Sequence, residues 1–270
     1  MSFLQLEGKT FLITGVANKK SVAWAVAKQL LDEGARCLFV VKDEQVAEGA
    51  KKLLADHDVL FCDVEQEADV ARLAKELTEK LNAEDKKIDG MLHSIAFADY
   101  SDGLRPFHET RKEAFLQALD ISCFSLVSLS NALKDLFAQD ASVVTVSIST
   151  TQMASENYGY MAPIKAALDS TVAFLTKSFS TFSQVRFNAV APGLLKTSAS
   201  AGIPGYVDSY LYAEEVIPRG KAVSTPEAAN VAVFLLSSAS SGMVAQKLVV
   251  DAGMAINYFD KSVVGKVVDG

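Results

Sequence analysis

The sequence predicts an α/β fold in which a doubly wound parallel β-sheet carries helices on both faces. Short runs of β-branched and aromatic residues alternate with longer stretches of helical periodicity along the chain. The short runs are apolar at nearly every position, as is typical of strands that are buried on both faces of a parallel sheet. No linker or repeat interrupts this alternation, so residues 1–270 are expected to form one domain.

The order of elements follows from the same pattern. Strands are expected at residues 9–15, 36–41, 59–64, 88–96, 142–148, 184–191 and 247–253. Helices are expected at residues 21–35, 43–56, 66–82, about 110–137, from about 162, and near 226–237. Residues 192–225 are irregular and rich in glycine and proline, with "YVDSYLYAEEV" as a possible short helix. Long segments of this kind in α/β domains are often lids over a binding site.

Composition excludes several classes of protein. The net charge is -7, which argues against broad binding to nucleic acid or to an anionic membrane. Cys37, Cys62 and Cys123 are widely spaced in apolar runs, which predicts buried free thiols in a reducing compartment and no metal site. The N-terminus lacks the features of a signal peptide, and no long uninterrupted apolar run predicts a membrane span. We therefore expect a cytoplasmic protein.

The first strand-to-helix turn has the features of a phosphate site. Gly15 allows a sharp turn where the strand ends, and Ser21 is placed to cap the following helix. The free N–H groups of that helix would face a pyrophosphate. The usual dinucleotide motif has three glycines, whereas here Ser21 and Ala23 stand where later glycines are expected.

Later strand ends point to the same ligand. Asp63 could accept a bond from an adenine amino group, although a turn or helix-cap role is an alternative. The small residues Ser94 and Ala96 leave room for a ribose, while His93 is expected to be packed in the strand. After the second strand, Lys42 would attract a 2′-phosphate and the acids that follow would oppose it, so NADH and NADPH both remain open.

"ENYGYMAPIKAALDS", residues 156–170, raises the question of which tyrosine works with Lys165. On a continuous helix Tyr158 and Lys165 would share a face, whereas Tyr160 would point about 140° away. Pro163 allows a second arrangement, in which the helix starts near residue 162 and Tyr158 lies in the preceding loop. A nearby ammonium makes a phenol a better hydrogen-bond donor, so the pair predicts acid chemistry at a carbonyl oxygen.

Six segments together resemble the bacterial-type enoyl-acyl-carrier-protein reductases, a divergent branch of the short-chain dehydrogenase/reductase superfamily. They are "GVANKKSVAWAVA", "FCDVEQEADV", "IDGMLHSIAFA", "ALDISCFSL", "NYGYMAPIKAALDS" and "VRFNAVAPGLLKTSASAGI". The resemblance implies a Rossmann-type homotetramer that reduces the trans-2 double bond of an acyl-carrier-protein thioester in fatty acid biosynthesis, with NAD(H) and possible NADP(H) use. It implies that Tyr158 and Lys165 are catalytic, because the family places its tyrosine seven residues before the lysine.

The resemblance also implies binding residues. The dinucleotide would contact the positions that match the family's contacts, which are Gly15, Ser21, Val22, Asp63, Val64, Ile95, Lys165 and Thr197. Lys42, Ser94 and Ala96 join this set because of their places at the strand ends. Ile148 stands at the family's second substrate contact. We add the hypothesis that Ile203 and Tyr206, in the lid, and Phe97 line the substrate site, with a core position as the alternative for Phe97. Two departures stand out: Ile148 replaces a second tyrosine common in the family, and Lys42 replaces a frequent glutamine.

Two alternatives are compatible with the residues. The first is a short-chain dehydrogenase that acts on a carbonyl or alcohol with help from Ser147 or Ser149, although Met161 stands where that chemistry needs a tyrosine. The second is a non-catalytic dinucleotide-binding protein, which Ile148 and Pro163 suggest.

Overall fold

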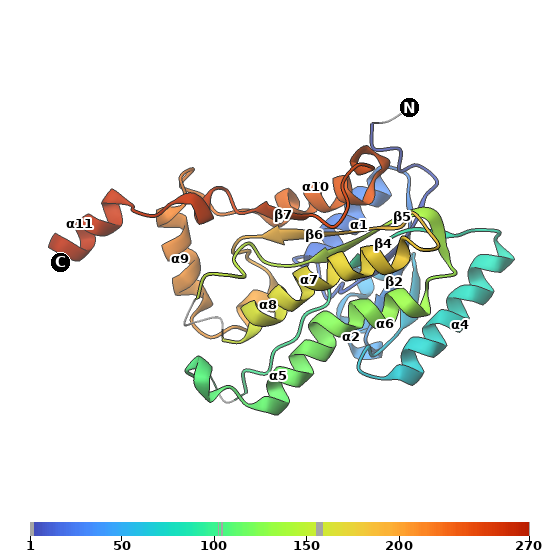
Figure 1. Ribbon diagram of the computed structural model, residues 1–270, viewed down its shortest axis with the longest axis horizontal. Coiled ribbons are helices and arrows are strands. Elements are labelled where there is room, and N and C mark those ends of the chain that lie inside the picture. The colour runs from blue at the N-terminus through green and yellow to red at the C-terminus, as the bar shows by residue number, and fades with distance from the viewer. Residues whose placement is uncertain (1–2, 102, 104, 155–158, 270) are drawn as a thin grey trace.

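A computed structural model describes residues 3–101, 103, 105–154 and 159–269. Seven parallel strands form one sheet in the order β3-β2-β1-β4-β5-β6-β7 (Figure 1). The strands are β1 (Thr10–Thr14), β2 (Arg36–Val41), β3 (Asp58–Phe61), β4 (Ile88–His93), β5 (Phe137–Val146), β6 (Arg186–Pro192) and β7 (Lys247–Val250). The order confirms the predicted doubly wound sheet, and it reverses direction between β1 and β4.

Helices cover both faces of the sheet. They are α1 (Val22–Asp32), α2 (Glu44–Gly49), α3 (Lys51–Leu54), α4 (Glu67–Ala83), α5 (Lys112–Leu119), α6 (Ser125–Ala132), α7 (Met161–Phe179), α8 (Ser198–Ala201), α9 (Tyr206–Val216), α10 (Thr225–Leu236) and α11 (Lys261–Asp269). Short 3-10 turns lie at η1 (Phe107–Glu109), η4 (Ser238–Ser240) and η5 (Met254–Ile256), and a π-helical segment, η2 (Asp120–Phe124), joins α5 to α6.

Side chains alternate along each strand between two cores. In β1, Leu12 packs into the core beneath α4, α6 and α7, whereas Phe11 and Ile13 pack into the core beneath α1 and α10. Because both faces are buried, the strands are apolar at nearly every position. The apolar runs that predicted strands therefore reflect two helical layers.

Three predicted elements differ in detail. The helix expected at 43–56 is interrupted at Ala50, and the helix expected around 110–137 contains η2 and ends at Ala132. β5 begins at Phe137 and ends at Val146, earlier than the predicted strand. The short helix expected in the irregular segment is confirmed as α9, whose bounds match the quoted stretch.

The C-terminal helix α11 lies away from the sheet and contacts α9 (Figure 1). Among the described residues, one helical stretch, Lys112–Ala132, is long and apolar enough to cross a membrane. Half of its most apolar part is buried inside the protein, so this is weak support for a membrane span.

Candidate active site

The ends of β1 and β4 meet closely where the strand order reverses. Thr14 Oγ1 donates to the carbonyl oxygen of Leu92 at 3.1 Å and accepts from the backbone N–H of Ser94 at 3.1 Å. Gly15 has a φ of +84°, and a Cβ added there would lie 2.0 Å from the Ser94 carbonyl oxygen. Only glycine fits this position, and ligands of open α/β sheets bind in the crevice at such a reversal.

The N-terminus of α1 follows this turn. Ser21 caps the helix by accepting from the backbone N–H of Trp24 at 3.4 Å, as predicted, and its hydroxyl donates to the carbonyl of Asn18 at 2.7 Å. Val22 is the first helical residue and is buried. First-turn N–H groups have no partner within their own helix, so this end of α1 suits the phosphates of a dinucleotide.

Lys42 is bracketed by two carboxylates. Its ammonium lies 3.1 Å from Asp63 Oδ2 and 3.5 Å from Glu65 Oε2. The hydrogen bond to Asp63 is the main cause of a raised pKa for Lys42. Asp63 Oδ1 also accepts from the backbone N–H of Glu65 at 3.2 Å, and the neighbouring Val64 is half-buried against the core. The structure thus brings two predicted adenosine-site residues, Lys42 and Asp63, into direct contact.

The chain after β4 is tied to the π-helical segment η2. Ser122 Oγ accepts from the Phe97 N–H at 2.9 Å and donates to the Phe97 carbonyl at 3.1 Å. Ile95 is half-buried, Ala96 is exposed, and the Phe97 side chain is 40% exposed. π-Helical turns are frequent at functional sites. Here η2 fixes the backbone that carries the predicted site residues Ile95, Ala96 and Phe97.

Lys165 lies in the second turn of α7 and is buried. Its ammonium donates to the carbonyl oxygen of Val146, at the end of β5, at 2.8 Å. Burial lowers the pKa of Lys165 to about 8, while Asp169 and Cys123 act in the opposite direction. A buried lysine with a lowered pKa at the carboxyl edge of the sheet is a candidate functional group.

Tyr160 is excluded as the partner of Lys165. Its hydroxyl accepts from the Asp99 N–H at 2.9 Å and donates to the Asp99 carbonyl at 3.2 Å. Burial is the largest effect on its pKa, which is raised. Tyr158 lies outside the described residues. The helix α7 begins at Met161, and Tyr160 is its N-cap residue. The observed start is therefore close to the alternative start near residue 162.

The segment after β5 remains tied to β6. The N–H of Ser147 donates to Val190 and that of Ser149 donates to Pro192, at 2.8 and 2.9 Å. Ile148 lies between these two anchored residues and is half-buried. The Ser147 hydroxyl donates to Asp169 Oδ1 at 2.5 Å, so this hydroxyl already has an acceptor within the protein.

The segment after β6 is also internally anchored. Tyr206 donates its hydroxyl to the Leu195 carbonyl at 2.9 Å and accepts from the Leu195 N–H at 2.8 Å. Thr197 Oγ1 accepts from the Ser200 N–H at 3.2 Å at the start of α8. Ile203 and Tyr206 are half-buried. The Tyr206 hydroxyl is thus engaged with backbone, which leaves its ring as the part that can contact a ligand.

Other titratable residues are packed as expected. His93 is fully buried between Thr145 and Ser125, with ring nitrogens 2.9 and 2.8 Å from their hydroxyls, and burial is the main cause of a pKa lowered to about 3. Cys37, Cys62 and Cys123 are buried free thiols, as predicted. Among the described residues, no group of three or more His, Cys, Asp and Glu side chains is placed to hold a metal ion.

The sequence reasoning missed Asp169, Lys247 and Ser122. Asp169 follows Lys165 by one helical turn, and this spacing was a usable signal. The Lys247 ammonium, on β7, lies 2.8 Å from the carboxylate of Asp169 on α7, and Ser122, on η2, bonds to the backbone of Phe97. Nothing local in the sequence predicts either contact.

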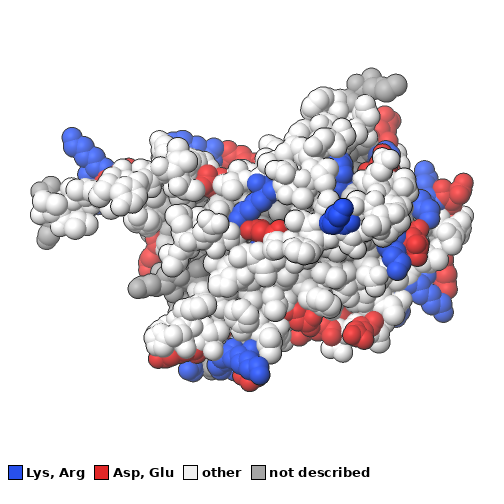
Figure 2. All heavy atoms as spheres, in the orientation of Figure 1, with Lys and Arg blue, Asp and Glu red and all other residues white. Residues whose placement is uncertain are grey.

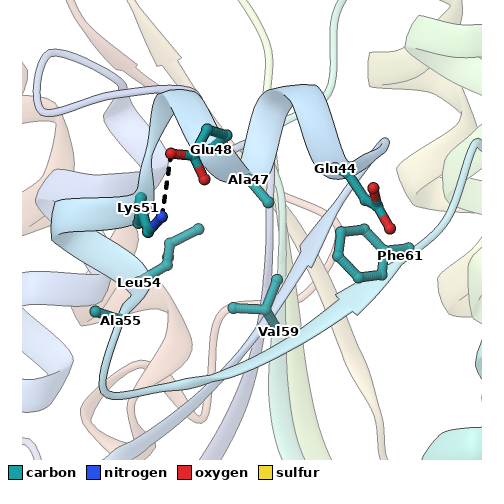
Figure 3. Close-up of a pocket in the computed structure, with 8 residues that line it drawn as sticks. All are labelled: Glu44, Ala47, Glu48, Lys51, Leu54, Ala55, Val59 and Phe61. Carbon is teal, nitrogen blue, oxygen red and sulfur yellow. Dashed lines mark hydrogen bonds and ion pairs between the residues drawn. The ribbon is translucent and has the colours of Figure 1, made fainter.

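A cavity of about 410 Å³ lies at the edge of the sheet, beside β3 (Figure 3). Its lining comes from α2, α3, β3 and the adjoining loop: Glu44, Ala47, Glu48, Lys51, Leu54, Ala55, Val59 and Phe61. Figure 3 shows Lys51 directed toward Glu48, which is 3.2 Å away, above the apolar side chains of Leu54 and Val59. None of the predicted site residues lines this cavity.

Comparison with known proteins identifies the family. The family described as Enoyl-(Acyl carrier protein) reductase matches residues 15–255. A Nostoc protein named enoyl-acyl-carrier-protein reductase (NADH) FabI is 34% identical, over 94% of this chain and 98% of its own length. A Staphylococcus aureus relative of the same name, but marked NADPH, is 32% identical over 93% of this chain and 98% of its own.

Solved structures agree with the sequence relatives. Enoyl-acyl-carrier-protein reductase (NADH) from Aquifex aeolicus superposes with a TM-score of 0.87 at 32% identity, covering 96% of this chain and 100% of its own. FabI from Candidatus Liberibacter asiaticus also gives 0.87, at 30% identity, over 95% of this chain and 98% of its own. The chain therefore belongs to the enoyl-acyl-carrier-protein reductase family.

Proposed function

We propose that this protein reduces the trans-2 double bond of an enoyl thioester carried by acyl carrier protein, using NADH or NADPH, in fatty acid biosynthesis. The observation that carries the proposal is the buried Lys165 ammonium, anchored to Val146 at the carboxyl edge of the sheet. A reduced nicotinamide would supply a hydride to the β-carbon of the substrate. The chain must then stabilise the negative charge on the thioester oxygen and admit a proton to the α-carbon.

The dinucleotide is proposed to bind at the carboxyl ends of β1 and β4, where the strand order reverses. At Gly15 an added Cβ would clash with the backbone of Ser94, so the absence of a side chain lets the two strand ends approach, and Ser21 and Val22 begin a helix that suits phosphates. In this proposal Asp63 and Val64 face the adenine, and Lys42 lies near its ribose. The residues assigned to the nicotinamide half are Ser94, Ile95, Ala96, Lys165 and Thr197.

Tyr158 has the role of donating a hydrogen bond to the developing enolate oxygen. Such a donor is typically worth about 3 kcal/mol of transition-state stabilisation. Lys165 binds the ribose hydroxyls and makes the phenol a stronger donor. Tyr160 supports this assignment by exclusion, because its hydroxyl already donates its one proton to the Asp99 carbonyl.

The substrate site is proposed to lie under a lid, residues 192–225, in a single catalytic domain of residues 1–270. Phe97 and Ile148 lie on loops that the protein anchors through Ser122 and β6. Ile203 and Tyr206 belong to the lid and are half-buried. Closing such a segment over an acyl chain excludes water from the reacting centre.

Purified protein should oxidise NADH or NADPH with crotonyl-acyl carrier protein and remain inactive with the acetoacetyl thioester. Tyr158→Phe should lower kcat about a hundredfold and leave cofactor affinity unchanged. Tyr160→Phe is the matched control: it should lower stability, since the Asp99 N–H loses its acceptor, and retain turnover of the folded enzyme. Near-normal turnover by Tyr158→Phe removes that residue from the mechanism.

We also propose that the protein is a cytoplasmic homotetramer. Large apolar side chains are exposed on α5, η2 and α7, where Leu116, Phe124 and Phe174 are 50%, 56% and 76% exposed. Figure 2 shows few charged side chains across the middle of the face that carries α6 and α7. Light scattering should give four times the 28.9 kDa chain mass, and Phe124→Glu should reduce it. A wild-type mass of one chain would contradict the tetramer.

A further inference from the structure

A polar cluster lies beside Lys165 and contains Ser147, Thr151, Asp169 and Lys247. Asp169 uses both carboxylate oxygens: Oδ1 accepts from the Ser147 hydroxyl at 2.5 Å, and Oδ2 lies 2.8 Å from the Lys247 ammonium. Lys247 also donates to Thr151 Oγ1 at 3.0 Å. The side chains of Asp169 and Lys247 are only 17% and 24% exposed, so solvent screens this pair less than a surface pair.

The cluster and Lys165 hold the same two elements together. Lys165 reaches Val146 and Asp169 reaches the next residue, Ser147, so α7 is attached at two points to the end of β5. Lys247 adds β7, which lies on the other side of β6. Figure 1 shows α7 crossing the sheet next to these strands. The position of the Lys165 ammonium is therefore determined partly by Asp169 and Lys247.

We propose that Asp169 and Lys247 are positioning residues for the nicotinamide site, which act through Lys165 by fixing its helix and by setting the charge beside its ammonium. The inference rests on the proposed function, because it assigns Lys165 to the cofactor. Neither side chain needs to touch cofactor or substrate.

The charges around Lys165 give the two residues opposite effects. Burial lowers the pKa of Lys165 to about 8, whereas Asp169, on its own helix, and Cys123, on η2, raise it. His93, on β4, is neutral at this pH because its pKa is about 3. Removing the Asp169 charge lowers the pKa of Lys165 further. Removing the Lys247 ammonium leaves Asp169 without its ion-pair partner, so we expect the uncompensated carboxylate to raise the pKa of Lys165.

The experiment measures NADH affinity by isothermal titration calorimetry between pH 6.5 and 9.5, without acyl substrate. Wild-type affinity should fall as pH rises through about 8, because Lys165 loses its proton. In Asp169→Asn the fall should begin about one pH unit lower, which corresponds to about tenfold less protonated lysine at a given alkaline pH. In Lys247→Met it should begin at higher pH, and Lys247→Arg should restore the wild-type curve.

Asp32→Asn is the control variant, since Asp32 forms an exposed pair with Lys28 on α1 and should leave the curve unchanged. A purely structural role would weaken binding in both Asp169→Asn and Lys247→Met at every pH. Shifts in the same direction, or no shift in either variant, overturn the inference. Opposite shifts in a protein that reduces no enoyl thioester would support it and refute the proposed activity. If the wild type binds neither NADH nor NADPH, both proposals are overturned.

Discussion

Gly15→Ala tests whether the contact between the ends of β1 and β4 builds the cofactor site. The new Cβ would lie 2.0 Å from the carbonyl oxygen and 2.7 Å from the carbonyl carbon of Ser94. Both atoms belong to the backbone, so a side-chain rotation cannot relieve the clash. The left-handed backbone costs an alanine about 1–2 kcal/mol, and forced backbone movement adds about 1–3 kcal/mol. We expect the free energy of unfolding to fall by about 2–5 kcal/mol.

Two other glycines separate these contributions. Gly8 has a φ of +72° with nothing within 4 Å of an added Cβ, so Gly8→Ala should cost only the conformational term of about 1–2 kcal/mol. Gly242 has open space and no positive φ, and Gly242→Ala should be nearly neutral. Urea unfolding followed by circular dichroism gives the free energies, and calorimetry gives NADH affinity. Only Gly15→Ala should weaken NADH binding. The reasoning fails if Gly15→Ala is no more destabilising than Gly8→Ala.

Three further predictions concern other parts of the site. Glu65→Gln removes one of the two carboxylates that hold Lys42, so the affinity for NADPH should rise relative to NADH in calorimetry; an unchanged ratio would refute this. Tyr206→Phe removes both hydrogen bonds to Leu195, so steady-state kinetics should show a larger rise in KM than fall in kcat. His93 has a folded-state pKa of about 3, below its ordinary value near 6.5, so its neutral form is favoured on folding. The contribution of His93 to the free energy of unfolding should be complete above pH 6.5 and should fall by about 1.4 kcal/mol per pH unit toward pH 3. His93→Gln should therefore flatten the pH dependence of urea unfolding.

Much of the fold could be predicted because its signals are local. All seven strands were expected from apolar runs, since burial on both faces leaves a pattern that needs no knowledge of neighbours. The cap at Ser21 and the short helix α9 follow from similarly local chemistry. The sequence did not predict where helices are interrupted, as at Ala50 and in the helix expected around 110–137. The π-helical turn at Asp120–Phe124 accompanies a hydrogen bond from Ser122 to Phe97, 25 residues away in sequence.

The site could be predicted only in part. Family resemblance and chemistry together placed Gly15, Ser21 and Lys165 at the carboxyl edge of the sheet, where the structure has them. The structure does not test helical spacing as a choice between the tyrosines, because α7 begins at Met161 and Tyr158 lies outside the described residues. The exclusion of Tyr160 depends instead on Asp99, a residue on a separate loop. No periodicity in the sequence records that contact.

Lys42 and Lys165 show why residue type alone does not define a cofactor site. Both are lysines that sequence reasoning assigned to the dinucleotide. Lys42 is about half exposed and lies between two carboxylates, and its pKa is raised; Lys165 is buried and its pKa is lowered to about 8. Near pH 8 the first is therefore fully charged while the second titrates. In the proposed site we therefore expect pH changes in this range to act on the nicotinamide half through Lys165, and we expect the choice between NADH and NADPH to respond to the pairing of Lys42.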